Sequence, residues 1–227
     1  MRLIKVTLIL AAMALLAVPA LAVTLNEVRI DQTSTDNDEY FELAGMPGES
    51  LNGLTLIVIG DGTALNGAIE AAVSLDGYSI AADGYFLGVE TTYTQTCGEA
   101  ADATFGTLLN FENSDNVTFM LVSGFTGIVG DDIDLDDDWT IDNVLWSSII
   151  DSIALVETPG TGDAYYGNAT VGPDGTYVPG HALVCDGYWV VGSFDLCITD
   201  SPGVDNATIC AVPDEKSSFG GVKSMFR

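Results

Sequence analysis

Short runs of valine, isoleucine, leucine, threonine, tyrosine and phenylalanine, separated by turn residues such as Asn52-Gly53, recur along most of this chain. Runs of this length are typical of β-strands, because β-branched and aromatic side chains fit a pleated surface. No long amphipathic helix is evident, and the alanine-rich segment Leu65–Val73 is the one candidate for a helical turn. The predicted strands are Leu25–Ile30, Tyr40–Leu43, Leu54–Ile59, Tyr85–Val89, Val117–Val122, Ile149–Val156 and Tyr188–Val191.

Seven short strands with frequent turn signals predict an all-β fold, an antiparallel β-sandwich. The segment Thr158–Pro179 is rich in glycine, threonine, proline and tyrosine, which indicates a long surface loop or an irregular hairpin. Four basic residues follow residue 22, and three of them lie in the last fifteen residues, Pro213–Arg227. We therefore expect one sandwich domain over residues 23–212 and a C-terminal basic and aromatic tail over residues 213–227.

The first 22 residues have the three parts of a secretory signal peptide. Arg2 and Lys5 form a positive region, Leu8–Val18 is an apolar run, and Ala20-Leu21-Ala22 is a cleavage site of small residues. The alternative is a membrane anchor, but the apolar run is short for a bilayer core of about 30 Å. We expect cleavage after residue 22, secretion or display at the cell surface, and no membrane span in the mature chain.

Charge narrows the possible partners. The predicted mature chain keeps all 33 acidic residues and has four basic ones, a formal charge of −29. Binding to nucleic acid or to an anionic membrane needs clustered lysine and arginine, so neither is expected here. Such a chain attracts cations, and it gains solubility through self-repulsion at some cost in stability.

The mature chain has an even number of cysteines, which after a signal peptide predicts two disulfides formed in an oxidising compartment. Their spacing does not match a zinc site. Three connectivities are possible, and proximity in the sequence favours Cys185–Cys197 together with Cys97–Cys210.

Six segments carry short motifs in a fixed order: Leu25-Asn26-Glu27-Val28, Asp38-Glu39-Tyr40-Phe41-Glu42-Leu43, Leu51-Asn52-Gly53-Leu54-Thr55-Leu56, Asp83-Gly84-Tyr85-Phe86-Leu87, Asp151-Ser152-Ile153-Ala154-Leu155 and Ser201-Pro202-Gly203-Val204-Asp205-Asn206. In this order they resemble strands and turns of the lamin-tail domain, an immunoglobulin-like β-sandwich. This resemblance implies a binding or scaffold module of a bacterial secreted protein rather than a catalyst, with long insertions at about residues 92–148 and 158–185. Phe219–Arg227 also resembles short tails on some bacterial secreted proteins.

The sharpest chemistry lies between Asp131 and Asp142, where seven of twelve residues are aspartate. Alternate spacing lets a curling loop direct successive side chains at one point, and calcium takes six to eight oxygen ligands. Without a cation, carboxylates held this close repel one another. The predicted calcium ligands are Asp132, Asp134, Asp136, Asp138, Asp142 and the carbonyl oxygen of Thr140.

This loop departs from the EF-hand pattern in two places. Trp139 stands where that pattern has glycine, and Leu145 stands where it has a bidentate glutamate. We therefore predict an isolated calcium loop with the weak affinity of extracellular modules, about 10⁻⁴ to 10⁻³ M. The alternative is a solvated acidic loop without an ion.

Two further acidic groups stand out. One is expected to be a solvated hairpin loop and contains Asp31, Asp36, Asp38 and Glu39. The other is the pair Glu27 and Glu42, which are predicted to face each other on adjacent strands. These two glutamates are expected to cap backbone amides or to share hydrogen bonds or a cation.

The one histidine, His181, lacks the surroundings of a catalytic triad, and no phosphate-binding glycine loop is present. We expect a secreted, non-enzymatic module for adhesion or assembly at the cell surface, with an extracellular protein or glycan as partner. One alternative is a carbohydrate-binding module, and the other is a secreted hydrolase that uses clustered carboxylates. Aromatic residues available for sugar binding are Trp139, Trp146, Tyr165, Tyr166, Tyr188 and Trp189.

Overall fold

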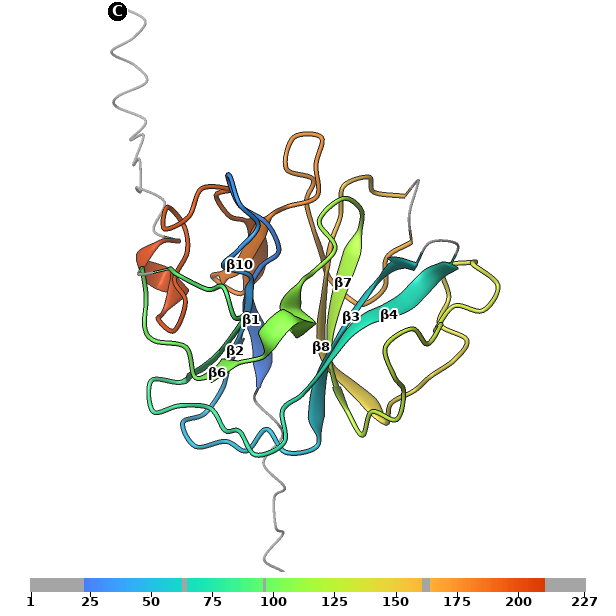
Figure 1. The fold of residues 1–227 in the computed structure, drawn as a ribbon, viewed down its shortest axis with the longest axis horizontal. Helices are drawn as coiled ribbons and strands as arrows, with labels where there is room; N and C mark the ends of the chain where they lie inside the picture. The colour runs from blue at the N-terminus through green and yellow to red at the C-terminus, as the bar shows by residue number, and fades with distance from the viewer. Residues whose placement is uncertain (1–22, 63–64, 96, 161–163, 211–227) are drawn as a thin grey trace, which may run out of the picture.

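A computed structural model describes residues 23–62, 65–95, 97–160 and 164–210 of the chain (Figure 1). The expected signal peptide and C-terminal tail lie outside these residues. Two sheets face each other and enclose a common apolar core, so the predicted all-β sandwich is confirmed. In the described part of the chain, no helix has the length and apolar character needed to cross a membrane.

The first sheet has six strands, and its long strands pair antiparallel. The two-residue edge strand β6 pairs parallel with β5. The order across the sheet is β11 (Tyr188–Val191), β10 (His181–Cys185), β1 (Thr24–Arg29), β2 (Tyr40–Ala44), β5 (Tyr85–Val89) and β6 (Ala103–Thr104).

The second sheet has five strands and is built in the same way, with a parallel two-residue strand, β9, at one edge. Two short 3₁₀ helices, η1 (Gly106–Leu109) and η2 (Asn206–Thr208), lie outside the sheets. The order across the second sheet is β4 (Leu65–Ser74), β3 (Leu54–Gly62), β7 (Val117–Ser123), β8 (Ser148–Leu155) and β9 (Thr170–Val171).

The predicted strands all occur, but the expectation for Leu65–Val73 was wrong. This segment is strand β4 and pairs along its length with β3. Ala71 and Val73 alternate into the core, so the pairing partner and the buried face outweigh the helix preference of alanine. Strand β10 was also missed, because it directly follows the segment Thr158–Pro179, which was interpreted as a loop or an irregular hairpin.

The core contains side chains from both sheets, such as Val28 and Phe41 from the first and Leu56 and Phe119 from the second. The outer faces are covered as well. Residues of β3, β4 and β7 form a second apolar cluster with Ile133, Ala164 and Tyr166 from the long loops. The regions expected as insertions therefore contain strands β6, β7, β9 and β10 and also cover the outside of the second sheet.

Candidate functional site

The acidic loop lies against the outer edge of β4. Ile69 N donates to Asp131 O at 2.9 Å, Ile133 N donates to Gly67 O at 3.0 Å, and Ala68 pairs with Asp132. Ile133 is buried in the apolar cluster on the outer face of the second sheet. A rigid sheet edge therefore holds the start of the loop, while most of the aspartates that follow are exposed.

Asp134 organises the turn. Its carboxylate is fully buried and accepts hydrogen bonds from Asp138 N at 3.1 Å and Trp139 N at 2.8 Å. The hydroxyl of Tyr166 donates to the same carboxylate at 2.8 Å. Gly67 permits this approach, because a β-carbon there would lie 2.9 Å from the Asp134 side chain. These bonds fold the loop back on itself.

The structure brings three of the predicted ligands together. Carboxylate oxygens of Asp134, Asp136 and Asp138 all lie within 4.8 Å of one another. The charge of Asp138, with smaller contributions from desolvation, Asp142 and Asp134, raises the pKa of Asp136. The loop thus concentrates negative charge in the way that a divalent cation would relieve.

Trp139 takes the backbone conformation expected of the glycine it replaces. Its φ is +70°, in the left-handed region that glycine adopts without a steric penalty. Its ring lies 6.0 Å from that of Tyr165, centroid to centroid, so an aromatic contact accompanies the sharp turn. The backbone at Trp139 is therefore strained, and this strain does not prevent the turn.

The other three predicted ligands are placed differently. Asp132 accepts a hydrogen bond from Asp134 N at 2.9 Å and so stabilises the entry to the loop. Thr140 N donates to Asp138 Oδ1 at 2.9 Å, and Asp142 N donates to Ile133 O at 2.9 Å. Asp142 influences Asp136 through its charge. The compact acidic group therefore consists of Asp134, Asp136 and Asp138, with Asp142 beside it.

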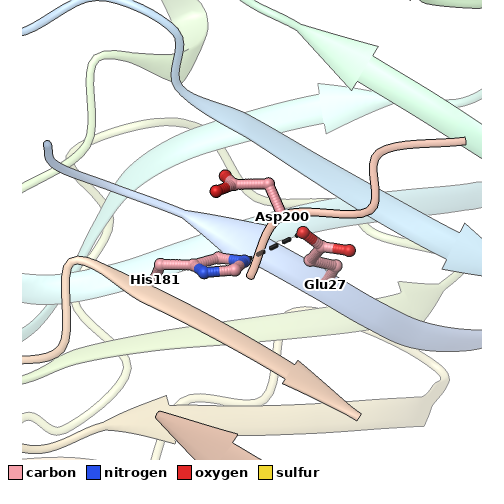
Figure 2. Close-up of side chains that lie close together, drawn as sticks. All are labelled: Glu27, His181 and Asp200. Atoms are coloured by element: carbon pink, nitrogen blue, oxygen red, sulfur yellow. Dashed lines mark hydrogen bonds and ion pairs between the residues drawn. The ribbon is translucent and has the colours of Figure 1, made fainter. Parts of the chain in front are cut away.

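A second cluster lies on the outer face of the first sheet and is completely buried. Figure 2 shows Glu27, His181 and Asp200 side by side, with His181 Nε2 at 2.8 Å from Glu27 Oε1. Arg29 Nη2 lies 2.7 Å from Asp200 Oδ1. The hydroxyl of Tyr40 donates to both Glu27 and Asp200. The segment that follows β11 covers this network and seals it from water.

The carboxylates of this cluster are near enough to share a metal ion. However, Asp200 already binds the guanidinium of Arg29, and Glu27 accepts bonds from His181, Tyr40 and Ser201. A metal would have to displace these partners and sit beside a buried arginine. Paired, hydrogen-bonded charges of this kind are the usual way to bury ionic groups. The arrangement fits a structural network better than a metal centre.

Glu27 and Glu42 face each other as cross-strand partners on β1 and β2, and both are buried. Glu27 accepts a hydrogen bond from Ser201 N at 3.1 Å, and Glu42 accepts one from Gly203 N. The prediction that they cap backbone amides is confirmed. Burial, together with the charge of Glu27, raises the pKa of Glu42 well above its usual value.

This capping holds the chain after β11, residues 192–210, which we call the closing segment. Asn206 Nδ2 donates to Val184 O at 3.0 Å, and Ser201 Oγ donates to Asn206 Oδ1 at 2.6 Å. Residues quoted for the family resemblance at opposite ends of the domain, Glu27 and Ser201 among them, therefore contact one another. Sequence reasoning missed Arg29 and Asp200, although Arg29 is the only arginine or lysine between residues 23 and 210.

The predicted disulfide connectivity was wrong. The bonds are Cys97–Cys197 and Cys185–Cys210. The chain after β11 turns back over the first sheet, which brings Cys210 to β10 and Cys197 to the loop after β5. Proximity in the sequence therefore gave the wrong pairing, because the folded chain brings together cysteines that are not neighbours in the sequence.

The acidic residues of the 31–39 segment divide into two kinds. Asp36 is exposed, whereas Asp38 and Glu39 are buried and do not belong to a solvated loop. Asp38 accepts hydrogen bonds from the amides of Thr94 and Gln95. Glu39 Oε1 accepts one from Phe111 N at 3.0 Å. Both carboxylates hold neighbouring loops against the sheet.

Burial raises the pKa of Glu39 from 4.5 to about 9, although the amide of Phe111 opposes the shift. The unfolded chain releases this proton near pH 4.5, so the stabilising effect of protonated Glu39 is complete below that pH and is lost as the pH rises to 9. Glu39→Gln should therefore raise the melting temperature at pH 8 by about 2 °C or more, and have little effect at pH 5. Thermal unfolding at both pH values tests this, with exposed Glu99→Gln as the control. A lower melting temperature for Glu39→Gln at pH 8 would contradict it.

The aromatic residues considered for sugar binding divide between the two sheets, and Trp146 packs against the apolar cluster on the outer face of the second sheet. Tyr166 is buried, and Trp139 and Tyr165 contact each other at the acidic loop beside the second sheet. Tyr188 and Trp189 lie on β11 at the edge of the first sheet.

Comparisons with known proteins add no family. Neither the protein-family models nor the curated proteins include a match to this chain. The sandwich and its side-chain clusters are therefore the basis for a functional conclusion.

Proposed function

We propose that this chain is a secreted, non-enzymatic binding module of the lamin-tail type, which binds calcium in its acidic loop and acts in adhesion or assembly at the cell surface. The convergence of the Asp134, Asp136 and Asp138 carboxylates within 4.8 Å is the observation that carries the calcium part of the proposal. Two disulfides and the predicted signal peptide support an extracellular location.

The calcium part follows from the chemistry of the loop. Carboxylate oxygens are the ligands that calcium prefers, and Asp136 and Asp138 are exposed and accessible to an ion from solvent. Asp134 is fixed by amide hydrogen bonds, so one ligand is already oriented. Thr140 and Asp142 lie within the same turn and would complete the ligand set by carbonyl and carboxylate oxygens.

Calcium should therefore stabilise the folded protein. With a dissociation constant of about 10⁻⁴ to 10⁻³ M, 5 mM calcium adds about 1–2 kcal/mol, or about 2–9 °C in melting temperature. The measurement compares thermal unfolding of residues 23–227 in EGTA and in calcium. Asp136→Asn and Asp138→Asn keep the size of the side chain and remove the charge, so each should abolish most of the shift.

Asp186→Asn is the matched control, because Asp186 lies in the exposed turn between β10 and β11. It should keep the full calcium shift. The calcium assignment fails if the native sequence shows no shift, or if the shift persists in both loop variants.

The adhesion role needs a separate test. The disulfide-bonded protein, immobilised on beads, should retain cells of its source organism in calcium and release them in EGTA, and the Asp136→Asn variant should retain fewer. Equal retention by uncoated beads would reject adhesion while leaving the calcium site intact. Turnover of an ester, glycan or phosphodiester that is lost on a single Asp→Asn change would reject the non-enzymatic assignment.

A further inference from the structure

The structure contains a pocket of about 650 Å³, and none of the residues that line it belongs to the acidic loop. It is formed where the end of β1, the loop before β7, the loop before β10 and the segment after β11 meet. Its volume is within the range of small-molecule sites, about 300–1,000 Å³. The residues that line it are Asp31, Asn113, Asp174, Gly175, Thr176, Tyr177, Val178 and Phe194.

Two walls of the pocket are held by the buried Arg29. Its guanidinium donates to Asp31 O at 2.9 Å and to Ser193 O at 3.0 Å, next to Phe194. The Phe194 ring packs on Gly180, where a β-carbon would lie 2.6 Å from the ring. These contacts fix the backbone at Asp31 and the position of the phenyl ring, so this side of the pocket is preformed.

Another part of the pocket lining is a tight hairpin in the loop that leads into β10, which is coloured orange in Figure 1. Asp174 N donates to Tyr177 O at 2.9 Å, and Tyr177 N donates to Asp174 O at 3.1 Å. Val178, the next residue, is buried in the main core and anchors the hairpin. Tyr177 is 72 % exposed, so its ring is accessible to a ligand from solvent.

The charge around this pocket has one sign. Both ionisable lining residues, Asp31 and Asp174, are acidic, and within the described residues the Asp174 carboxylate has no hydrogen-bond or ion-pair partner. Arg29, the only arginine or lysine between residues 23 and 210, is buried and paired with Asp200. An anionic ligand is disfavoured here, and an organic cation meets two carboxylates that lack a basic side chain at the surface.

We propose that this pocket binds a quaternary ammonium group. The faces of aromatic rings attract such cations, and nearby carboxylates supply the opposite charge. A methylated ammonium cannot donate N–H hydrogen bonds and presents an apolar surface, which suits walls made of Tyr177, Val178 and Phe194. A primary ammonium would need several hydrogen-bond acceptors in a close array. The site is distinct from the calcium loop and does not depend on the adhesion role.

Choline is the probe, and its neutral isostere 3,3-dimethyl-1-butanol tests whether charge is required. Titration of the disulfide-bonded protein, followed by calorimetry or by NMR chemical shifts at low ionic strength, should give a dissociation constant for choline at least about tenfold lower than for the isostere. Tyr177→Ala and Asp174→Asn should each weaken choline binding about fivefold or more. Matched controls Tyr188→Ala and Asp186→Asn alter an exposed tyrosine and an exposed aspartate that do not line the pocket, and should bind as the native sequence does.

Sedimentation with phosphatidylcholine vesicles identifies the source of the group. Binding to vesicles that is lost in Tyr177→Ala indicates a lipid headgroup, whereas binding of free choline alone indicates a soluble ligand. The proposal is overturned if choline does not bind at 50 mM, if the isostere binds equally well, or if Tyr177→Ala leaves the affinity unchanged. A neutral oligosaccharide that shifts pocket resonances when choline does not would replace it with a glycan site.

Discussion

Arg29→Met should lower the free energy of unfolding by about 3–5 kcal/mol, because it leaves a buried carboxylate without its counter-charge. Arg29 and Asp200 are both fully buried, and the guanidinium Nη2 lies 2.7 Å from Asp200 Oδ1. Methionine matches the aliphatic stem of arginine and ends before the guanidinium, so it can replace neither the ion pair nor the bonds to Asp31 O and Ser193 O. Urea unfolding at pH 7, followed by far- and near-ultraviolet circular dichroism, measures the loss.

A double-mutant cycle separates the ion pair from the other contacts of Arg29. Arg29→Met combined with Asp200→Leu removes both charges, and a buried pair replaced by apolar groups is often close to neutral. The double variant should therefore be more stable than Arg29→Met alone. Arg29→Lys keeps the charge and loses the planar fork, so it should cost less than methionine and remain folded. A cost below about 1 kcal/mol for Arg29→Met would show that the network is not a major source of stability.

The position of this network also determines how charge is distributed between the interior and the surface of the sandwich. Arg29, the only arginine or lysine within residues 23–210, is buried in the interior, where it neutralises Asp200 beside Glu27. Across the surface formed by the described residues, carboxylates therefore have no lysine or arginine side chain to pair with. Self-repulsion among them opposes folding, and cations that bind or screen them relieve it. The calcium proposal and the ammonium proposal both follow from this separation of charges.

Strand positions were predictable because their signals are local. Val117–Ser123 and Tyr85–Val89 combine β-branched or aromatic side chains with nearby turn residues. Strand β4 was not predicted because alanine favours helix, and the pairing of β4 with β3 overrides that preference. Intrinsic propensity therefore determines the secondary structure of an exposed segment, whereas the pairing partner determines that of a segment with a buried face.

The candidate sites were less predictable, since they depend on where distant segments meet. The spacing of Asp134, Asp136 and Asp138 was visible in the sequence, because a single turn brings them together. The network of Arg29 and Asp200 joins residues 171 positions apart. The available signal was Arg29 itself, an arginine within a predicted strand of a chain that has very few basic residues. This signal indicated a buried charge, but it could not identify Asp200 as the partner.

Removal of the Cys97–Cys197 disulfide is the second change with a large expected effect. The bond joins residues 100 positions apart, whereas Cys185–Cys210 joins residues 25 apart. In the chain-entropy model a loop of about 100 residues contributes about 4.7 kcal/mol and one of about 25 residues about 3.5 kcal/mol, because a longer cross-link restricts the unfolded chain more. The double variant Cys97→Ala/Cys197→Ala should therefore lose more stability than Cys185→Ala/Cys210→Ala.

Urea unfolding of the two double variants under non-reducing conditions tests this order, after peptide mapping has established that the remaining disulfide is intact. The shorter bond lies at the end of the closing segment, where Asn206 still bonds Val184 O. Its loss should therefore leave that segment docked and cost less. If Cys185→Ala/Cys210→Ala proves the more damaging change, the closing segment contributes more to stability than loop closure does, because its docking on Glu27 and Glu42 then depends on the covalent bond.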